Sequence, residues 1–245
     1  MKLQHYLKQF DRLAIALSGG ADSACLLREA AAALGPNRVL AVTVQTECTP
    51  QRRLRMAKRI AALADVEHVI MQAEVLSDKS ILENGPRRAY FYQRTLLHAV
   101  LDEAWIRGCE QTADGMHADE AGRMEREAGE ELHIISPFIA CGMGAWQVAA
   151  LRKGMAEDAA QGGGCLADRI PAGTPLTLDA LTRIDEAEEA LLRLGYPAAR
   201  VRLDTDAALV YAPEGEYSSL AARWNDAEAE LQKAGFDTVR LLAPV

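Results

Sequence analysis

The stretch Ser18-Gly19-Gly20-Ala21-Asp22-Ser23 lies between two runs of opposite character. Residues 13–17 before it form a short apolar run, typical of a buried strand, and residues 24–34 after it are rich in Ala and Leu, which favour a helix. A glycine pair at this junction lets the backbone turn sharply and approach a ligand closely. The first helical N–H groups and the two serine hydroxyls can then surround one point, so the stretch predicts a phosphate-binding loop.

An ordinary turn capped by a serine or aspartate side chain is the alternative interpretation of this junction. Six residues of this type, between a strand and a helix near the N-terminus, favour a nucleotide. The stretch is not a Walker A loop, because no Lys-Ser or Lys-Thr pair follows a G-x-x-x-x-G frame. The sequence therefore predicts a nucleotide-binding loop of another kind.

Strand and helix patterns alternate along the first two thirds of the chain. Further strands are predicted at 38–44, 68–71, 108–113 and 133–138, and further helices at 51–64, 89–107 and 145–160. This alternation predicts an α/β fold with a doubly wound parallel sheet. In such sheets a ligand binds beyond the carboxyl ends of the strands, where the loop at 18–23 lies.

The pattern changes after the glycine run 162–164, which is typical of a linker or mobile loop. Beyond it the sequence predicts a small α+β domain, with helices at 177–194 and 218–234 and strands at 199–203, 207–211 and 238–242. We therefore predict a nucleotide-binding domain at 1–160, a glycine-rich junction at 161–176 and an α+β substrate-binding domain at 177–245.

Charge and composition argue against several classes of protein. The 245 residues carry a net charge of −8, which argues against a nucleic-acid or membrane-surface partner, because such partners need a basic face. The five cysteines include no C-x-x-C pair, so neither a zinc ribbon nor a disulfide framework is expected. We find no signal peptide and no apolar run long enough to span a membrane, and we expect a cytoplasmic protein.

A second informative stretch runs from Cys165 to Thr177, with the sequence CLADRIPAGTPLT. A cysteine after three glycines should have an accessible backbone, and Arg169 could stabilise its thiolate. The alternative is a small apolar residue at a domain junction. The other four cysteines are expected to be inert thiols, and Trp105 and Trp146, which lie on predicted helices, are expected in the core.

These stretches resemble known families. The S-G-G-x-D-S motif is similar to that of the PP-loop ATP pyrophosphatases, and C-L-x-x-R-I-P-x-G-T-x-L-T placed after it resembles the LarE family. Members of that family are ATP-dependent sacrificial sulfur transferases that build the nickel-pincer nucleotide of lactate racemase. The resemblance extends to Thr43, Asp114-Gly115 with Asp119, and Glu188 with Arg200 and Arg202.

The resemblance implies a reaction and roles for residues. The family adenylylates a carboxylate of a mononucleotide, and the cysteine matching Cys165 then gives up its sulfur and becomes dehydroalanine. ATP and Mg²⁺ are the implied cofactors, and the subunits are expected to associate. The implied ATP-binding residues are Ser18, Gly19, Gly20, Asp22, Ser23, Thr43, Asp114 and Gly115. The implied substrate-binding residues are Arg169, Glu188, Arg200 and Arg202, and the implied metal ligands are Asp22 and Asp119.

Alternation along a strand would place Arg200 and Arg202 on one face, where they could clamp a phosphate, or where they could be solvated surface charges. The chain also departs from the family. Asp168 replaces a common serine, Tyr211 stands where a glutamate is usual, and residues 88–92 lack the cysteines that hold an iron–sulfur cluster in some members. Two other hypotheses therefore stay open: a PP-loop ligase or amidotransferase that uses ammonia or an external sulfur donor, and a non-catalytic ATP- or AMP-binding protein.

Overall fold

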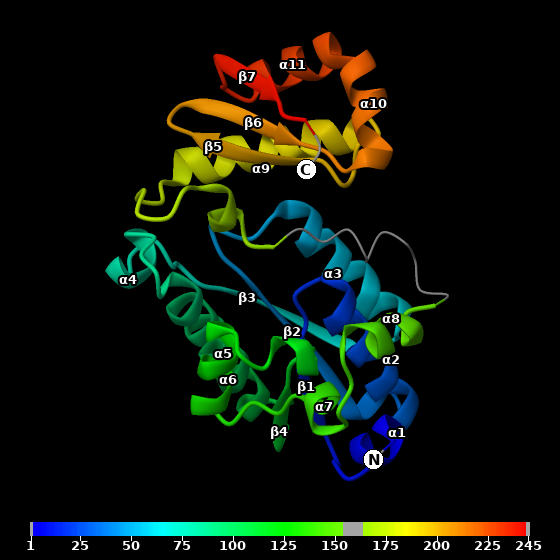
Figure 1. The fold of residues 1–245 in the computed structure, drawn as a ribbon. Coiled ribbons are helices and arrows are strands. Elements are labelled where there is room, and N and C mark those ends of the chain that lie inside the picture. The colour runs from blue at the N-terminus through cyan, green and yellow to red at the C-terminus, as the bar shows by residue number, and fades with distance from the viewer. Residues whose placement is uncertain (1, 154–163, 244–245) are drawn as a thin grey trace. The chain divides into compact units, whose positions relative to one another are not determined.

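The computed structural model describes residues 2–153 and 164–243. These divide into two compact units (Figure 1). Unit 1 consists of Met1–Thr46, Arg53–Val75 and Arg87–Gly162, and unit 2 consists of Glu47–Arg52, Leu76–Pro86 and Gly163–Val245. Among the described residues, no helix has the length and apolar character needed to cross a membrane.

Unit 1 contains a parallel sheet of four strands in the order β3-β2-β1-β4. The strands are β1 (Leu13–Ala16), β2 (Val39–Gln45), β3 (Glu67–Gln72) and β4 (Gln111–Ala113). The central strand β1 pairs with β2 on one side and with β4 on the other. The predicted α/β fold with a parallel sheet is confirmed.

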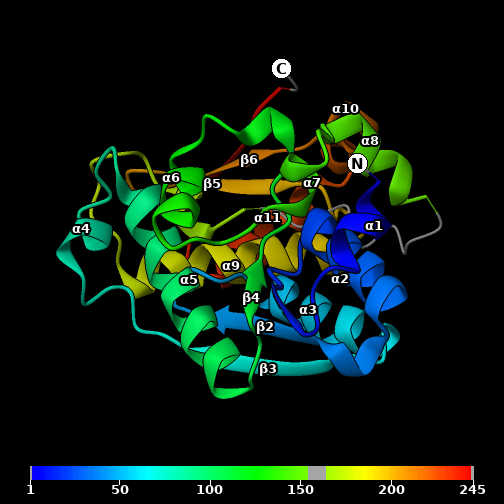
Figure 2. The same ribbon diagram turned by 90° about the horizontal axis from the view of Figure 1, so that it is seen from below.

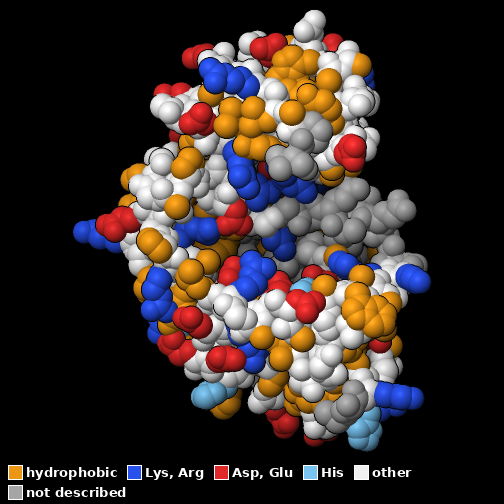
Figure 3. Space-filling model, in the orientation of Figure 1, with side chains coloured by type: hydrophobic (Ala, Val, Ile, Leu, Met, Phe, Trp, Pro, Cys, Tyr) orange, Lys and Arg blue, Asp and Glu red, His pale blue; other side chains and the backbone are white. Residues whose placement is uncertain are grey.

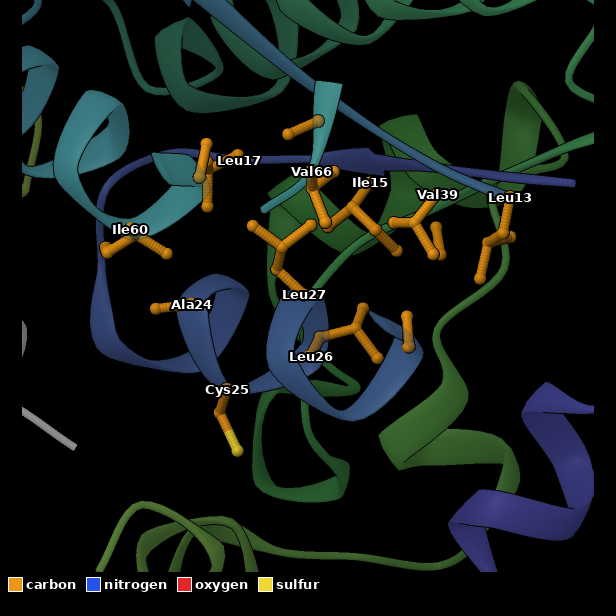
Figure 4. Close-up of a cluster of buried hydrophobic side chains, with 14 of the residues drawn as sticks. Leu13, Ile15, Leu17, Ala24, Cys25, Leu26, Leu27, Val39, Ile60 and Val66 are labelled. Atoms are coloured by element: carbon orange, nitrogen blue, oxygen red, sulfur yellow. The ribbon is translucent and has the colours of Figure 1, made fainter. Parts of the chain in front are cut away.

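Helices cover both faces of this sheet, as Figures 1 and 2 show. Alternate residues of β1 point to opposite sides: Leu13 and Ile15 pack with α2 (Ala21–Leu34), whereas Ala14 packs with α5 (Arg88–Ile106). Figure 4 shows the first of these two cores, in which leucines of α2 meet the side chains of β1 and β2. Because apolar side chains on both faces are buried, β1 reads in sequence as a continuous apolar run.

Short helices complete unit 1. They are α1 (Leu3–Leu7), η1 (Pro36–Arg38), η2 (Ala118–Glu120), α6 (Met124–Glu131), α7 (Pro137–Ala140) and α8 (Ala145–Leu151), and the longer α3 (Gln51–Leu63) begins in unit 2 and continues in unit 1. On the face of the molecule in Figure 3, acidic and basic side chains are interspersed over this unit.

Three expectations for unit 1 need correction or restriction. The strand predicted at 133–138 is only an isolated bridge between Ala113 and Ile135, because Pro137 starts α7. The side chains of Trp105 and Trp146 are 83% and 74% exposed, so they do not lie in the core. The predicted end of the helix at 145–160 and the start of the glycine run fall on residues 154–163, outside the described residues.

Unit 2 contains a three-stranded sheet in the order β5-β6-β7, in which β5 and β6 are antiparallel and β6 and β7 are parallel. Its elements are α4 (Lys79–Leu82), η4 (Leu166–Arg169), α9 (Leu178–Arg193), β5 (Arg200–Asp204), β6 (Ala207–Tyr211), α10 (Glu214–Ala222), α11 (Trp224–Lys233) and β7 (Thr238–Leu241). The predicted α+β character is confirmed, although the helix expected at 218–234 is broken at Arg223 into α10 and α11.

Candidate functional site

The loop predicted to bind phosphate joins β1 to α2 and is closed by its own serines. The Ser23 hydroxyl donates to the carbonyl of Gly20 at 3.1 Å, and the Ser18 and Ser23 hydroxyl oxygens are 3.1 Å apart. The backbone N–H of Ser18 donates to the Ser23 hydroxyl, with 3.3 Å between the heavy atoms. Gly20 is the N-cap of α2, and no side-chain oxygen caps the first N–H groups of this helix, which is the arrangement that favours an anion.

Both loop glycines meet one residue of α3. Gly19 has a φ of +74°, and a Cβ there would lie 2.2 Å from the Arg53 carbonyl oxygen. A Cβ on Gly20 would lie 2.9 Å from Arg53 Nη2, which donates to the Ser18 hydroxyl at 2.8 Å. Sequence reasoning did not single out Arg53, because it lies 35 residues from Ser18 and belongs to no motif.

Asp114 and Gly115 lie at the end of β4 and have different surroundings. Gly115 packs on the first turn of α2, where a Cβ would lie 2.7 Å from the Ser23 nitrogen. Asp114 is buried and accepts hydrogen bonds from the Ser136 hydroxyl at 2.6 Å and from the Met116 N–H at 3.1 Å. Burial raises the pKa of Asp114. The hydrogen bonds of Asp114 therefore hold the turn in which Gly115 packs against the first turn of α2.

The other predicted ATP and metal residues are held by protein groups. The buried Thr43 hydroxyl donates to the Leu17 carbonyl at 2.6 Å. Asp22 forms an ion pair with Arg152 at 3.4 Å, and Asp119 accepts from the Ala145 N–H at 2.6 Å. Within residues 2–153 and 164–243, no group of three or more His, Cys, Asp or Glu side chains could hold a metal ion.

In unit 2, Cys165 is half-buried and immediately precedes η4. The next residue, Leu166, donates its N–H to the Cys48 carbonyl at 2.9 Å, and the Arg169 Nη1 donates to the Cys165 carbonyl at 3.1 Å. A Cβ on Gly164 would lie 2.7 Å from an Asp168 carboxylate oxygen. Hydrogen bonds thus hold the backbone on the carbonyl side of Cys165.

Asn84 holds the remainder of the cysteine stretch. It is 3% exposed and has a φ of +50°, and its side-chain amide donates to the carbonyls of Ile170 at 3.3 Å and Pro171 at 3.0 Å. Its own carbonyl accepts from the Gly173 N–H at 2.9 Å. Buried amide hydrogen bonds of this kind position a loop firmly.

Glu188 of α9 is the centre of a buried charge cluster. The side chain is 1% exposed and accepts from Arg169 Nε at 3.0 Å and from Arg52 Nη2 at 2.9 Å. It also accepts from the Val201 N–H of the edge strand β5 at 3.2 Å. Arg169 and Glu188, both predicted from sequence, are therefore brought together, and Arg52 is a partner that the sequence did not reveal.

Arg200 and Arg202 lie two residues apart on β5 but have different partners. Arg200 donates to the carbonyls of Pro197 at 2.9 Å and Ala199 at 2.7 Å. Burial first, and then the neighbouring charge of Arg52, lower the pKa of Arg200 to about 10. The Arg202 guanidinium lies over the ring of Tyr211, 5.2 Å from its centroid. The charge of Arg200 thus interacts with the cluster around Glu188. The single negative charge of Glu188 is outweighed by three positive charges, those of Arg52, Arg169 and Arg200.

Asp185 gives unit 2 a pH-dependent contact. Its carboxylate accepts from the Gln51 N–H at 3.2 Å, and burial raises its pKa from 3.8 to about 6. Between pH 4 and 6 the Asp185 carboxyl is ionised in the unfolded chain but still largely protonated in the folded chain. Because the folded chain binds more protons in this range, the contribution of Asp185 to the free energy of unfolding falls as pH rises. We expect Asp185→Asn to remove that dependence. The melting temperature of the variant minus that of the wild type should then rise between pH 5 and 7.5. Asp179→Asn, which changes an exposed carboxylate of the same helix, is the control for removing a negative charge.

The fold and the loop of unit 1 define a class: an α/β protein of the PP-loop type, with a glycine loop at the carboxyl end of a central parallel strand. Comparison with known proteins narrows this class.

The chain is 28% identical over 239 residues to the pyridinium-3,5-bisthiocarboxylic acid mononucleotide synthase of Lactiplantibacillus plantarum, covering 96% of this chain and 87% of that protein. It is also 28% identical over 217 residues to an uncharacterized Synechocystis protein, covering 86% of this chain and 80% of that protein. No family model matches the chain. The resemblance to the LarE family, predicted from separate motifs, is confirmed as a similarity along nearly the whole chain.

Proposed function

We propose that this protein is an ATP-dependent sulfur transferase that activates a substrate carboxylate and donates the sulfur of Cys165. Cys165 carries the proposal: it is half-buried, its backbone is fixed by hydrogen bonds, and Arg169 links it to the arginine cluster. The similarity to a bisthiocarboxylic acid mononucleotide synthase supports sulfur as the transferred atom.

The proposed reaction has three balanced steps. The substrate carboxylate attacks the α-phosphorus of ATP, which gives an acyl-adenylate and pyrophosphate. The Cys165 thiolate then attacks the acyl carbon, forms a thioester and releases AMP. Finally a base removes the Cys165 Cα proton and the Cβ–S bond breaks, so the substrate leaves as a thiocarboxylate and a dehydroalanine stays in the chain. No oxidant or reductant is consumed.

The described residues can be assigned to these steps. In unit 1, the loop from Ser18 to Ser23 binds the phosphates of ATP through the start of α2. In unit 2, Arg52, Arg169 and Arg200 bind an anionic group of the substrate, because their combined charge exceeds that of Glu188. Asp22 and Asp119 are the carboxylates that would hold Mg²⁺ together with the nucleotide, and the ion would offset phosphate charge there.

Intact-mass measurement tests the sacrificial step. After incubation with ATP, Mg²⁺ and a pyridinium carboxylate mononucleotide, the protein should lose one sulfur and two hydrogen atoms, and pyrophosphate should appear. Cys165→Ser should still release pyrophosphate but form no thiocarboxylate. Cys141→Ser, which changes the other half-buried cysteine, should behave as the wild type does. Thiocarboxylate formation at an unchanged protein mass would instead indicate an external sulfur donor, and ATP binding without pyrophosphate release would indicate a non-catalytic protein.

A further inference from the structure

The side chain of Arg53 occupies the mouth of the glycine loop. Its Nη2 donates to the Ser18 hydroxyl at 2.8 Å and lies 2.9 Å from the point where a Cβ of Gly20 would stand. Its backbone carbonyl lies 2.2 Å from the equivalent point of Gly19. The absence of side chains at both glycines therefore makes room for Arg53, a role distinct from the close approach of a ligand.

The position of Arg53 matters because the loop itself contains no cation. The start of a helix offers only about half a positive charge, whereas a polyphosphate carries several negative charges. The charged residue inside the loop, Asp22, is acidic and is paired with Arg152 at 3.4 Å. A full positive charge next to Ser18 must come from outside the loop, and Arg53 brings one from the first turn of α3.

The chemistry of the guanidinium suits a phosphate. Its five N–H donors lie in a planar fork that matches two phosphate oxygens at once. The Ser18 hydroxyl, which accepts from the Arg53 Nη2 at 2.8 Å, carries no charge. A charge-assisted hydrogen bond to phosphate is stronger than the bond to a neutral hydroxyl, so a bound polyphosphate can draw the guanidinium toward itself.

We propose that Arg53 binds the β- and γ-phosphates of ATP and holds the pyrophosphate leaving group. This inference rests on the proposed function, because it requires ATP at the loop of unit 1. In the adenylylation step the bond between the α-phosphorus and the bridging oxygen breaks and negative charge develops on pyrophosphate. Arg53 offsets that charge as it forms.

Calorimetric titration of the full chain tests the inference, with Mg²⁺ and three probes: ATP, inorganic pyrophosphate and AMP. Arg53→Ala should bind ATP and pyrophosphate about 10- to 100-fold more weakly than the wild type does, since a hydrogen bond to a charged group is removed, and should bind AMP equally well. Arg53→Lys keeps the charge but loses the fork, so its loss should be intermediate. Lys58→Ala removes a positive charge from the exposed face of α3 and should change none of the three affinities about 2-fold or more.

The possible outcomes separate this inference from the proposed function. If the wild type binds ATP and Arg53→Ala binds pyrophosphate equally well, the role of Arg53 is wrong and the proposed function stands. If Arg53→Ala loses AMP together with pyrophosphate, Arg53 only supports the loop, and the inference is overturned. If the wild type binds none of the three probes, both the proposed function and the inference fail. Thermal melting of each variant, expected to match the wild type, shows whether the chain remains folded.

Discussion

Replacing Glu188 with alanine is expected to lower the free energy of unfolding of unit 2 by about 3–5 kcal/mol, the usual result of removing one partner from a buried ion pair. The carboxylate is 1% exposed and pairs with Arg169 and Arg52, whose side chains are 8% and 10% exposed. Alanine would leave these two guanidinium groups buried without their counter-charge. It would also leave the Val201 N–H of the edge strand β5 without its acceptor.

The size of this effect depends on charge more than on volume. Burial and the neighbouring cations already lower the pKa of Arg200, so positive charge in this region is disfavoured before Glu188 is removed. Glu188→Gln keeps the shape and can still accept from Val201, and its loss of stability should be smaller than that of Glu188→Ala. Glu186→Ala changes an exposed acid of the same helix and should stay within about 0.5 kcal/mol of the wild type.

Tryptophan fluorescence during urea denaturation can measure this effect in unit 2. The chain has three tryptophans, of which Trp105 and Trp146 lie exposed in unit 1 and Trp224 begins α11 in unit 2. With Trp105 and Trp146 replaced by phenylalanine, Trp224 alone reports the unfolding of unit 2. Equal stability of Glu188→Ala and Glu186→Ala would show that the cluster contributes no net stability.

The sequence could predict those parts of the molecule whose structure is determined by residues close together in the chain. The parallel sheet follows from apolar runs such as 13–17, and the loop at 18–23 follows from glycines between a strand and a helix. Cys165 and Arg169 were recognised because they are four residues apart and belong to one motif. The resemblance implied that Glu188 and Arg169 both bind the substrate. The structure shows in addition that the two side chains form an ion pair.

The parts that could not be predicted depend on contacts distant in sequence. Arg52 meets Glu188 across 136 residues, and Arg53 meets Ser18 across 35. The segments Glu47–Arg52 and Leu76–Pro86 join unit 2 through backbone hydrogen bonds, such as that from Leu166 to Cys48, which leave no trace in composition or periodicity. Trp105 lies in the last turn of α5, where helical periodicity continues but the side chain is exposed.

Replacing Gly19 with alanine is expected to have the second large effect, through two separate costs. The first is the φ of +74°, which costs an L-residue about 1–2 kcal/mol. The second is steric overlap: the new Cβ would lie 2.2 Å from the Arg53 carbonyl oxygen and 3.0 Å from its carbonyl carbon. These atoms belong to the backbone of α3, which cannot yield as a flexible side chain can, so either the loop or the start of the helix must move.

Gly108→Ala separates the two costs. Gly108 follows α5 in the same unit with a φ of +70°, but a Cβ there would meet no atom within 4 Å. It should therefore lose about 1–2 kcal/mol of stability and keep ATP binding. Gly19→Ala should lose roughly 1–3 kcal/mol more, because overpacking adds to the backbone strain, and should bind ATP much more weakly because the loop is displaced from Arg53.

Urea denaturation followed by circular dichroism gives the stability of these two variants, and calorimetric titration gives their ATP affinity. A displaced loop can relieve the overlap, in which case the stability of Gly19→Ala approaches that of Gly108→Ala while ATP binding is still lost. Equal stability combined with equal ATP affinity would contradict the prediction, since it would mean that the contact between Gly19 and Arg53 constrains neither the fold nor the loop. The contact matters for function only if moving the loop away from α3 weakens the binding of the phosphates.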